Sequence, residues 1–276
     1  MSYFSPTALA DALDILSRGP GKIIAGGTDV YPSARPGESP DYFLDLTRVD
    51  ALSAIRQNAA GTYFGATVTW TDIVRADLHP AFDALKAAGR EVGSVQIQNA
   101  GTLAGNLCNA SPAADGVPAL LALEAVVEIA SAARGARDVP LADFITGVRQ
   151  TALAPDELVR GIRVPPQPEG MQSAFEKLGS RTYLVISICM TAANVLLDAR
   201  GRIAEARVAV GACSAVAQRL AGLEKRLIGM RPADLRVTPE DLEDLSPIDD
   251  VRGTASYRLD AVQEQIQRTL QRASAA

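Results

Sequence analysis

The chain alternates short apolar runs with turns that are rich in glycine and proline. Leu9, Leu13 and Leu16 recur at helical spacing, which predicts an amphipathic helix near the start of the chain. Ser5-Pro6 is typical of a helix start, because serine caps free amides and proline suits the first helical position. Gly19-Pro20-Gly21 is typical of a helix end. We therefore expect a helix between these two signals.

Apolar runs after this helix predict short strands. Residues 22–25 and 42–46 are expected to be strands of one small unit, and residues 63–70 are expected to begin a new sheet. Thr71 is predicted to cap the helix that comes after it, and a further helix is expected over residues 81–92.

Residues 99–115 depart from this pattern. They are mostly small or polar, with little helical or alternating hydrophobic period, and small residues stand where a core strand would need bulk. Pro165-Pro166-Gln167-Pro168 is the best linker candidate. The second half of the chain predicts strands at residues 157–164, 173–178 and 207–210 and helices at residues 217–228, 239–245 and 255–272.

Length and composition narrow the class of protein. The chain has 276 residues, enough for one large domain or two modest ones of about 150 residues each. Hydrophobic residues make up 47% and charged residues 21%, which indicates a folded chain rather than a disordered one. The net charge of −5 argues against nucleic acid or an anionic membrane as the partner.

The cysteines and the histidine offer little metal chemistry. Cys108, Cys189 and Cys213 lie far apart without a CxxC pair, so neither a disulfide framework nor a zinc or iron–sulfur site is expected on this chain. We expect them to be small buried side chains. His79 precedes Pro80 in a segment that is typical of a helix junction, so it is expected to be a surface or capping residue.

The apolar segments are too short to predict a membrane span. Residues 1–6 lack a basic stretch followed by an apolar run, and the apolar stretch 184–197 is interrupted by Ser187, Thr191 and Asn194. A cytoplasmic location is therefore expected.

Two glycine-rich segments carry the chemical signal. Gly26-Gly27-Thr28-Asp29 follows a predicted strand, so its successive amides can form a nest for an anion. Gly101-Thr102 and Gly105-Asn106 offer a second such surface. Two nests suit a ligand with two phosphates, although glycine turns at strand ends are often purely structural. Neither segment has the GxGxxG or GxxxxGK[ST] spacing of the Rossmann and P-loop motifs.

These segments resemble a known family. AGGTDVYP at residues 25–32 and GSVQIQNAGTLAGNLCNASPAADGVPALLAL at residues 93–123 resemble the two FAD-binding motifs of the flavoprotein (medium) subunit of molybdenum hydroxylases. That family includes subunits of carbon monoxide, xanthine and nicotine dehydrogenases and of 4-hydroxybenzoyl-CoA reductase. AFEKLGSR at residues 174–181 and VAVGACSAVAQRLAGLEKRL at residues 208–227 extend the resemblance over the whole chain.

The resemblance implies an α+β fold. Residues 1–168 are expected to form a two-lobed FAD-binding domain of the PCMH type, with lobes at about residues 1–55 and 56–168. Residues 169–276 are expected to form a smaller α+β domain of the CO dehydrogenase flavoprotein C-terminal type.

The resemblance also implies a set of FAD contacts. The pyrophosphate is expected to be wrapped by two segments, comprising Ala25, Gly26, Gly27, Thr28, Asp29 and Val30 and then Thr102, Ala104, Gly105 and Asn106. The ribityl and adenosine portions are expected near Asn109, Ser111 and Asp115. The flavin itself is expected near Lys177 and Ile162, with Tyr183 as a weaker candidate.

Three of these positions have further interpretations. Asp115 is alternatively the cap of the helix after Pro112, and Lys177 is alternatively an ordinary exposed lysine. Ala104 stands where many relatives have glycine, and its methyl group disfavours a positive φ. FAD binding is expected to survive this change if residue 104 has ordinary dihedral angles.

The function implied by the resemblance is electron transfer. FAD would be bound noncovalently, because His79 lies outside both motifs, and covalent attachment is a remote alternative. FAD would take electrons from iron–sulfur (2Fe-2S) clusters and pass them to an external acceptor. The clusters and the molybdopterin would lie on a small and a large partner subunit, in a heterotrimer or a dimer of heterotrimers. No side chain is assigned as catalytic and no metal is assigned to this chain.

Two alternatives remain at this point. One is a stand-alone FAD oxidoreductase with its own substrate pocket, which needs acid–base groups near the flavin that the sequence does not nominate. The other is a scaffold subunit that has lost FAD and only bridges its partners.

Overall fold

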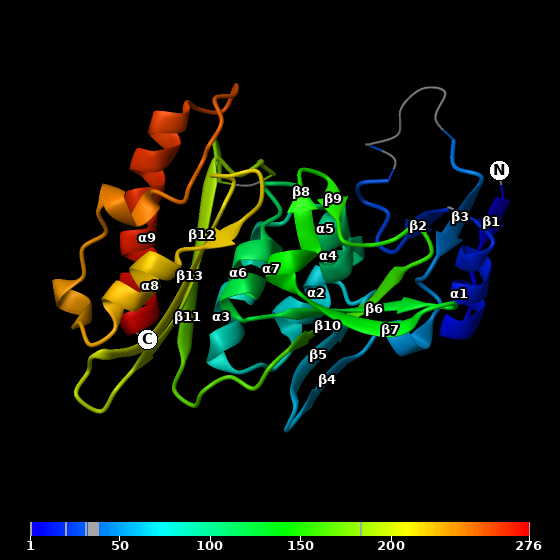
Figure 1. Cartoon of the computed structure of the whole chain (residues 1–276), viewed down its shortest axis with the longest axis horizontal. Helices are drawn as coiled ribbons and strands as arrows, with labels where there is room; N and C mark the ends of the chain where they lie inside the picture. The colour runs from blue at the N-terminus through cyan, green and yellow to red at the C-terminus, as the bar shows by residue number, and fades with distance from the viewer. Residues whose placement is uncertain (1, 20, 31, 33–38, 183, 276) are drawn as a thin grey trace.

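The computed structural model describes residues 2–19, 21–30, 32, 39–182 and 184–275. Figure 1 shows an elongated molecule with three parts in a row, from an N-terminal lobe at one end to a C-terminal domain at the other. Each part is built around one main β-sheet. Tyr183 lies outside the described residues.

The N-terminal lobe holds a three-stranded parallel sheet in the order β1-β3-β2. The central strand β3 is the most buried of the three, and it contacts the only helix of this lobe among the described residues. The strands predicted here are confirmed. The elements are β1 (Ser2–Phe4), α1 (Leu9–Ser17), β2 (Lys22–Ile24) and β3 (Tyr42–Asp45).

The start of the first helix was predicted wrongly. Ser5 and Pro6 lie in a connection, and α1 begins only at Leu9, after the extended residue Ala8. The preceding residues form β1 because they pair in parallel with β3, with Ser2 opposite Tyr42. The backbone hydrogen bonds of this pairing are available only in the folded chain, so a local capping signal could not reveal them.

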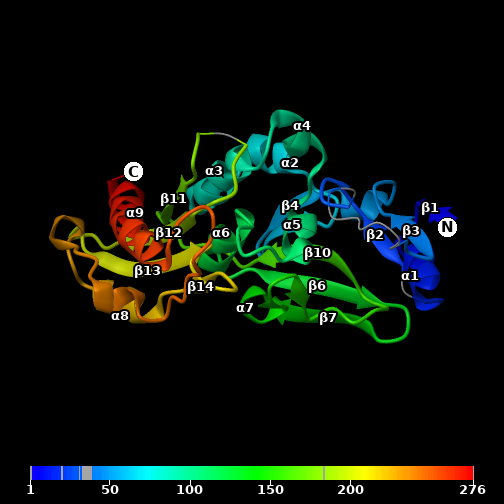
Figure 2. The same cartoon turned by 90° about the horizontal axis from the view of Figure 1, so that it is seen from above.

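The second lobe holds a five-stranded antiparallel sheet in the order β4-β5-β10-β6-β7. Figure 2 shows α2, α3 and α4 gathered on one side of this sheet. Its strands are β4 (Ile55–Asn58), β5 (Gly61–Gly65), β6 (Val126–Ser131), β7 (Gly135–Pro140) and β10 (Leu158–Val164). A small hairpin beside it is formed by β8 (Ile145–Gly147) and β9 (Gln150–Thr151). Its helices are α2 (Trp70–Arg75), α3 (Asp83–Glu91), α4 (Val95–Ala100), α5 (Leu103–Asn109), α6 (Gly116–Ala122) and α7 (Leu141–Phe144).

Residues 99–115 contain the end of α4 and all of α5, although their sequence has little helical period. One further prediction for this lobe was wrong. The cap of α2 is Thr69 rather than Thr71: the Thr69 hydroxyl accepts from the Asp72 amide at 3.2 Å, and the Asp72 carboxylate accepts from the Thr69 amide at 2.9 Å. This reciprocal capping box satisfies two amides that otherwise have no partner.

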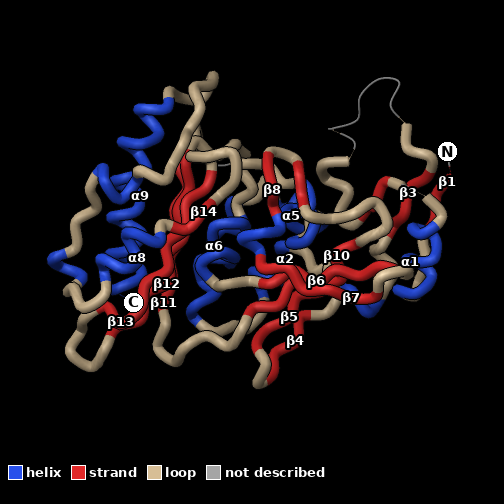
Figure 3. Tube along the Cα trace, in the orientation of Figure 1, coloured by secondary structure: helices blue, strands red, loops and turns tan. Residues whose placement is uncertain are grey.

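The C-terminal domain holds an antiparallel sheet in the order β11-β12-β13-β14. Residues 165–171, without helix or strand, connect it to β10. Figures 1 and 3 show α9 and α8 on the outer side of this sheet and α6 and α3 on its inner side. The predicted helix at residues 239–245 is a short 3-10 helix, Pro239–Leu242. The elements are β11 (Gln172–Leu178), β12 (Cys189–Leu197), β13 (Ile203–Gly211), β14 (Gln218–Arg219), α8 (Ala221–Leu227) and α9 (Ala255–Ala275).

Strand β12 joins the two parts because its side chains alternate between two cores. Met190 and Ala192 belong to the core that runs through the second lobe, whereas Ala193 and Val195 pack in the core of the C-terminal domain. Successive side chains of a strand point to opposite faces, so one buried strand supplies both cores. The C-terminal domain is therefore packed against the second lobe over a continuous apolar surface.

Candidate cofactor-binding site

The two glycine-rich segments lie against each other. A Cβ atom placed on Gly26 would lie 2.0 Å from the carbonyl oxygen of Ala100, so no side chain fits between the two backbones. On the other side of this contact, the position of a Cβ on Gly101 is 3.6 Å from the Thr28 hydroxyl oxygen. The two predicted nests are thus parts of one surface.

The first segment presents free amides. Gly27 has a φ of +68°, which a residue with a side chain rarely adopts, and its carbonyl accepts from the Val30 amide at 3.1 Å. Within the described chain, the amides of Gly26, Gly27 and Thr28 donate to no acceptor. All three residues are partly exposed. Adjacent free amides in a left-handed turn fit the predicted anion-binding role.

The second segment is the start of helix α5. The Thr102 hydroxyl caps this helix by accepting from the Gly105 amide at 3.0 Å, and Gly105 itself is exposed. Ala104 is buried in the first turn, with helical rather than positive φ. Its methyl group therefore costs no backbone strain, and this departure from the family motif is compatible with the same loop.

A buried polar cluster lies next to this segment. The Asn106 side-chain oxygen accepts from the Gly116 amide at 3.3 Å. The adjacent Asp115 carboxylate accepts from the Lys177 ammonium group at 2.7 Å and from the Ser187 hydroxyl at 2.7 Å. The side chains of Asp115 and Lys177 are only 8% and 5% exposed. Burial raises the pKa of the Asp115 carboxyl, and Lys177 and Ser187 act in the opposite direction.

This cluster decides between the interpretations left open above. The Asp115 side chain makes no cap hydrogen bond to α6, so the capping interpretation is wrong. Lys177 is buried in an ion pair, so it is not an ordinary exposed lysine. Ser187 was missed as a site residue. Its signal in the sequence is a hydroxyl within an apolar run, because a buried polar group needs a hydrogen-bond partner.

The remaining predicted contacts lie farther along these elements. Asn109 ends α5, where its side-chain oxygen and its carbonyl oxygen both accept from Arg149, and the Ser111 hydroxyl accepts from the Ala113 amide at 3.2 Å. Arg149 is a second residue that sequence reasoning missed. Ile162 has no exposed surface and packs in the core between β5 and β6. We therefore leave Ile162 out of the proposed contact surface.

The cysteine and histidine predictions have mixed outcomes. Cys189 and Cys213 are buried as expected, but Cys108 is exposed, because it lies on the outer side of α5 rather than facing the core as Leu107 does. His79 is a capping residue, as predicted: its Nδ1 atom accepts from the Ala81 amide at 3.1 Å. In the part of the chain that the structure describes, no cluster of three or more potential metal ligands occurs.

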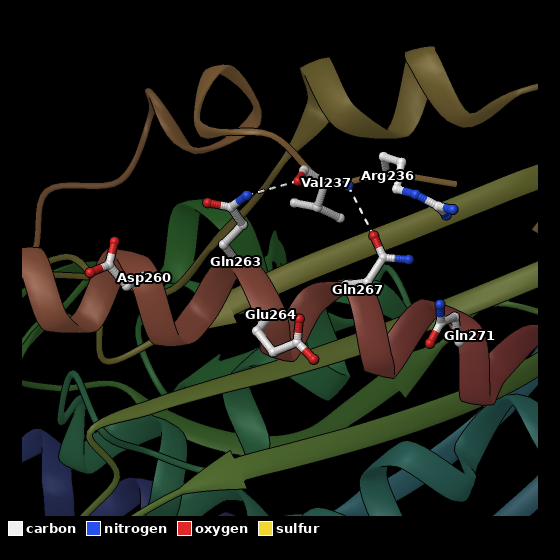
Figure 4. A pocket seen from close by; sticks show the side chains of 7 residues that line it. All are labelled: Arg236, Val237, Asp260, Gln263, Glu264, Gln267 and Gln271. Atoms are coloured by element: carbon white, nitrogen blue, oxygen red, sulfur yellow. Dashed lines mark hydrogen bonds between the residues drawn. The ribbon is translucent and has the colours of Figure 1, made fainter. Parts of the chain in front are cut away.

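A large pocket of about 570 Å³ lies away from these motifs, on helix α9. Figure 4 shows Gln263 and Gln267 directed at the backbone of Val237. Gln263 donates to the Val237 carbonyl at 2.9 Å and Gln267 accepts from the Val237 amide at 3.0 Å, so these side chains hold the segment around Val237 to the helix.

Among the described residues, no helix is both long and apolar enough for a membrane crossing.

Comparison with known families agrees with this arrangement. Residues 1–167 match the family described as the FAD binding domain in molybdopterin dehydrogenase. This chain belongs to that family. Residues 173–273 match the CO dehydrogenase flavoprotein C-terminal domain, so the chain has both parts in the order that the motifs predicted.

Individual relatives match this chain over nearly its whole length. It is 34% identical to the nicotine 6-hydroxylase medium subunit of Paenarthrobacter nicotinovorans, over 99% of this chain and 97% of that one. It is 30% identical to the xanthine dehydrogenase FAD-binding subunit of Escherichia coli O157:H7, over 100% and 96% of the two chains. A chain in the structure of reconstituted CO dehydrogenase from Oligotropha carboxidovorans matches with a TM-score of 0.91 and 25% identity, over 100% and 98% of the chains. These relatives are subunits of oxidoreductases.

Proposed function

We propose that this chain binds FAD noncovalently and carries electrons from iron–sulfur clusters of a partner subunit to an external acceptor. The observation that carries the proposal is the contact between the two glycine-rich segments, with the free amides of residues 26–28 beside it. Two motifs that are far apart in the sequence thereby form one surface for a diphosphate. The family match supports FAD as the ligand.

The residues of this surface have distinct roles in the proposal. The amides of residues 26–28 and the start of α5 hold the pyrophosphate, and Gly26 and Gly27 allow the backbone to approach it. Ala25, Asp29 and Val30 frame the first loop, and Asn106, Asn109 and Ser111 continue the surface along α5. The exposed Gly105 leaves space beside the cap of α5.

In this proposal Lys177 lies near the flavin, and Asp115, its ion-pair partner, lies near the ribityl and adenosine portions of the cofactor. Their ion pair and the Ser187 hydroxyl hold each other in one geometry, so the cofactor would meet a prearranged pair of charges. When bound, a flavin can exchange one or two electrons, which suits it to connect single-electron clusters with a two-electron acceptor. The chain supplies position and electrostatics.

The partners in this proposal are a small iron–sulfur subunit and a large molybdenum-cofactor subunit, in a heterotrimer or a dimer of heterotrimers. Support comes from relatives that are themselves named as medium subunits or chains, including the CO dehydrogenase medium chain of Hydrogenophaga pseudoflava, 26% identical over 97% of this chain. A domain boundary at residue 168, lobes that meet near residue 55 and a cytoplasmic location remain parts of the proposal.

The test is cofactor analysis of the purified full chain, alone and co-expressed with its partner subunits. The proposal predicts a flavin absorbance spectrum, and FAD that is released into the supernatant by acid precipitation. Flavin that stays with the denatured pellet would contradict noncovalent binding. Absence of flavin from both preparations would contradict FAD binding and would favour the scaffold alternative.

A further inference from the structure

A second pocket, of about 260 Å³, opens on the face of the five-stranded sheet that points away from the core. Phe64 and Ile162 point into the core, so their neighbours along the strands, Tyr63 and Arg163, point to the opposite face. None of the residues around the pocket belongs to the glycine-rich motifs. The lining residues are Arg56, Asn58, Ala60, Gly61, Thr62, Tyr63, Glu128, Arg160 and Arg163.

The pocket holds more positive than negative charge. Three guanidinium groups line it, but Glu128 is the only carboxylate among its described lining residues. Glu128 lies 3.6 Å from Arg160 Nε and 3.4 Å from Arg163 Nε, longer than the ~2.7–2.9 Å of a charge-assisted hydrogen bond. Arg163 also pairs with Asp138 at 2.6 Å. The shared carboxylate therefore leaves guanidinium donors unused.

Arg160 lacks a hydrogen bond at its Nε atom, and Arg56 lacks an ion pair, among the described residues. Arg160 Nε is buried and has no hydrogen-bond acceptor in the described chain. Arg56 forms no ion pair with any described residue; its guanidinium carbon lies 4.5 Å from the centre of the Tyr63 ring. In a chain with a net charge of −5, three guanidinium groups in one concave site, one of them without an ion pair in the described chain, favour an anionic ligand.

The Tyr63 side chain contacts Arg56 and the backbone of strand β10. Arg56 covers one face of its ring, and the ring lies against Gly161, where a Cβ atom would come within 2.3 Å of it. The Tyr63 hydroxyl donates to the Arg160 carbonyl at 2.9 Å. The Tyr63 side chain therefore contacts Arg56 through its ring and the backbone of Arg160 through its hydroxyl group.

We propose that this pocket is a binding site for the phosphate group of a small molecule. Guanidinium groups match the geometry of phosphate oxygens, and Arg56, Arg160 and Arg163 approach one site from two strands. The guanidinium groups recognise the phosphate oxygens of the ligand. The site goes beyond the FAD function, because it uses a different surface and different residues.

The test is calorimetric titration of the full chain with inorganic phosphate, and separately with AMP as an organic phosphate. Saturable phosphate binding is expected, and Arg56→Gln and Arg160→Gln are each expected to weaken it at least tenfold. Glu128→Gln is expected to strengthen it several-fold, because the carboxylate competes with the ligand for Arg160 and Arg163. Comparable affinities for both probes identify phosphate esters as ligands, and binding of inorganic phosphate alone identifies the free ion.

The control variant is Arg200→Gln, which removes the same charge from an exposed turn between β12 and β13. It should leave phosphate affinity unchanged. The proposal is overturned if no saturable binding occurs, if Arg200→Gln weakens binding as much as Arg56→Gln does, or if Glu128→Gln fails to strengthen it. Phosphate that binds to the glycine-rich segments of flavin-free chain would not respond to these substitutions, because the substituted residues line a different surface. Failure of the FAD proposal would therefore leave this test unaffected.

Discussion

Gly26 and Gly27 are neighbours with different physical requirements. Gly26 is needed because the Ala100 carbonyl occupies the position of a side chain. Gly27 is needed for its φ of +68°, whereas a Cβ atom there would contact only Ile24, at 3.6 Å. Substitution at Gly27 therefore leaves the packing of the chain intact and acts on backbone strain and on the space beside the free amides.

Gly27→Val is expected to lose most bound FAD and to lower the free energy of unfolding by roughly 1–2 kcal/mol, the cost of a left-handed residue with a side chain. Gly27→Asn is expected to lose FAD with a smaller loss of stability, because asparagine tolerates this conformation. The measurements are flavin content per chain and urea unfolding. Gly222→Ala, on an exposed part of α8 with open space around it, is the control and should keep its flavin. Full flavin occupancy in Gly27→Val would remove the pyrophosphate assignment.

The pKa of the Glu157 carboxyl is strongly lowered by its hydrogen-bond partners. Its carboxylate accepts two hydrogen bonds of 2.8 Å from Arg137 and one of 2.9 Å from the Ala154 amide. The Arg137 hydrogen bonds are the main cause that lowers the pKa of Glu157 to about 2. In the unfolded chain the carboxyl has its ordinary, higher pKa, so the unfolded chain binds a proton first as the pH falls.

Glu157 is therefore expected to stabilise the fold fully above about pH 5 and to lose this contribution as the pH falls towards 2. At ~1.4 kcal/mol per pKa unit, the contribution is about 3 kcal/mol or less. Glu157→Gln should be less stable at neutral pH and should show a flatter decline in stability between about pH 5 and 2. The measurement is urea unfolding as a function of pH, with exposed Glu169→Gln as the control. Equal pH slopes in Glu157→Gln and the unsubstituted chain would contradict the prediction.

At the scale of elements, Arg258 ties helix α9 to the chain that enters β12. Its guanidinium group donates to the carbonyls of Ile188 and Ala212 and pairs with Asp250 at 2.7 Å. Ile188 follows Ser187, which holds Asp115. The end of the β11–β12 connection is thus fixed from both sides, by α9 and by the start of α6.

Arg258→Met is expected to destabilise the chain by about 2–4 kcal/mol, because two buried carbonyls lose their donor. Amide hydrogen exchange at residues 184–188 should accelerate. Arg252→Met provides a matched control: Arg252 pairs with the same Asp250 at 2.8 Å, but from the exposed side, and its loss should cost under ~1 kcal/mol. Equal effects of the two substitutions would show that Arg258 does not hold this connection.

At the scale of the whole molecule, the second lobe covers the inner face of the C-terminal sheet. Met190 and Ala192 pack into the core of the second lobe, and the Asn194 side chain donates to the Ala81 carbonyl at 3.0 Å. The buried cluster of Asp115, Lys177 and Ser187 spans the same boundary. The second lobe supplies Asp115 and the C-terminal domain supplies Lys177 and Ser187, so the two parts of the chain are joined by this cluster.

If the chain serves electron transfer, it should not oxidise an organic substrate alone. Its electrons would come from a partner subunit, and the chain would contribute the position of the cofactor. Anaerobic bleaching of the flavin by the organic substrate should therefore require the co-expressed partner subunits. The reduced form of the external acceptor can reduce the flavin without them. Bleaching by a small organic substrate in the isolated chain would favour a stand-alone oxidoreductase.

The sequence by itself determined the features that depend on a few neighbouring residues. Strands at residues 22–24 and 158–164, the capping role of His79, and the two glycine-rich motifs in their order could all be predicted, because alternation, caps and turns are encoded locally. The family resemblance followed from those motifs, and it predicted a lysine and an aspartate near the same cofactor.

Only the tertiary structure decided what distant residues do together. Helix α5 is rich in small residues without a clear period, so its helical state depends on packing rather than on local pattern. The meeting of Asp115 with Lys177 and Ser187, the exposure of Cys108 and the arginine pocket on the open face of the sheet all depend on which elements become neighbours. Burial and pairing of charges are properties of that arrangement, because each arises from groups that the sequence keeps far apart.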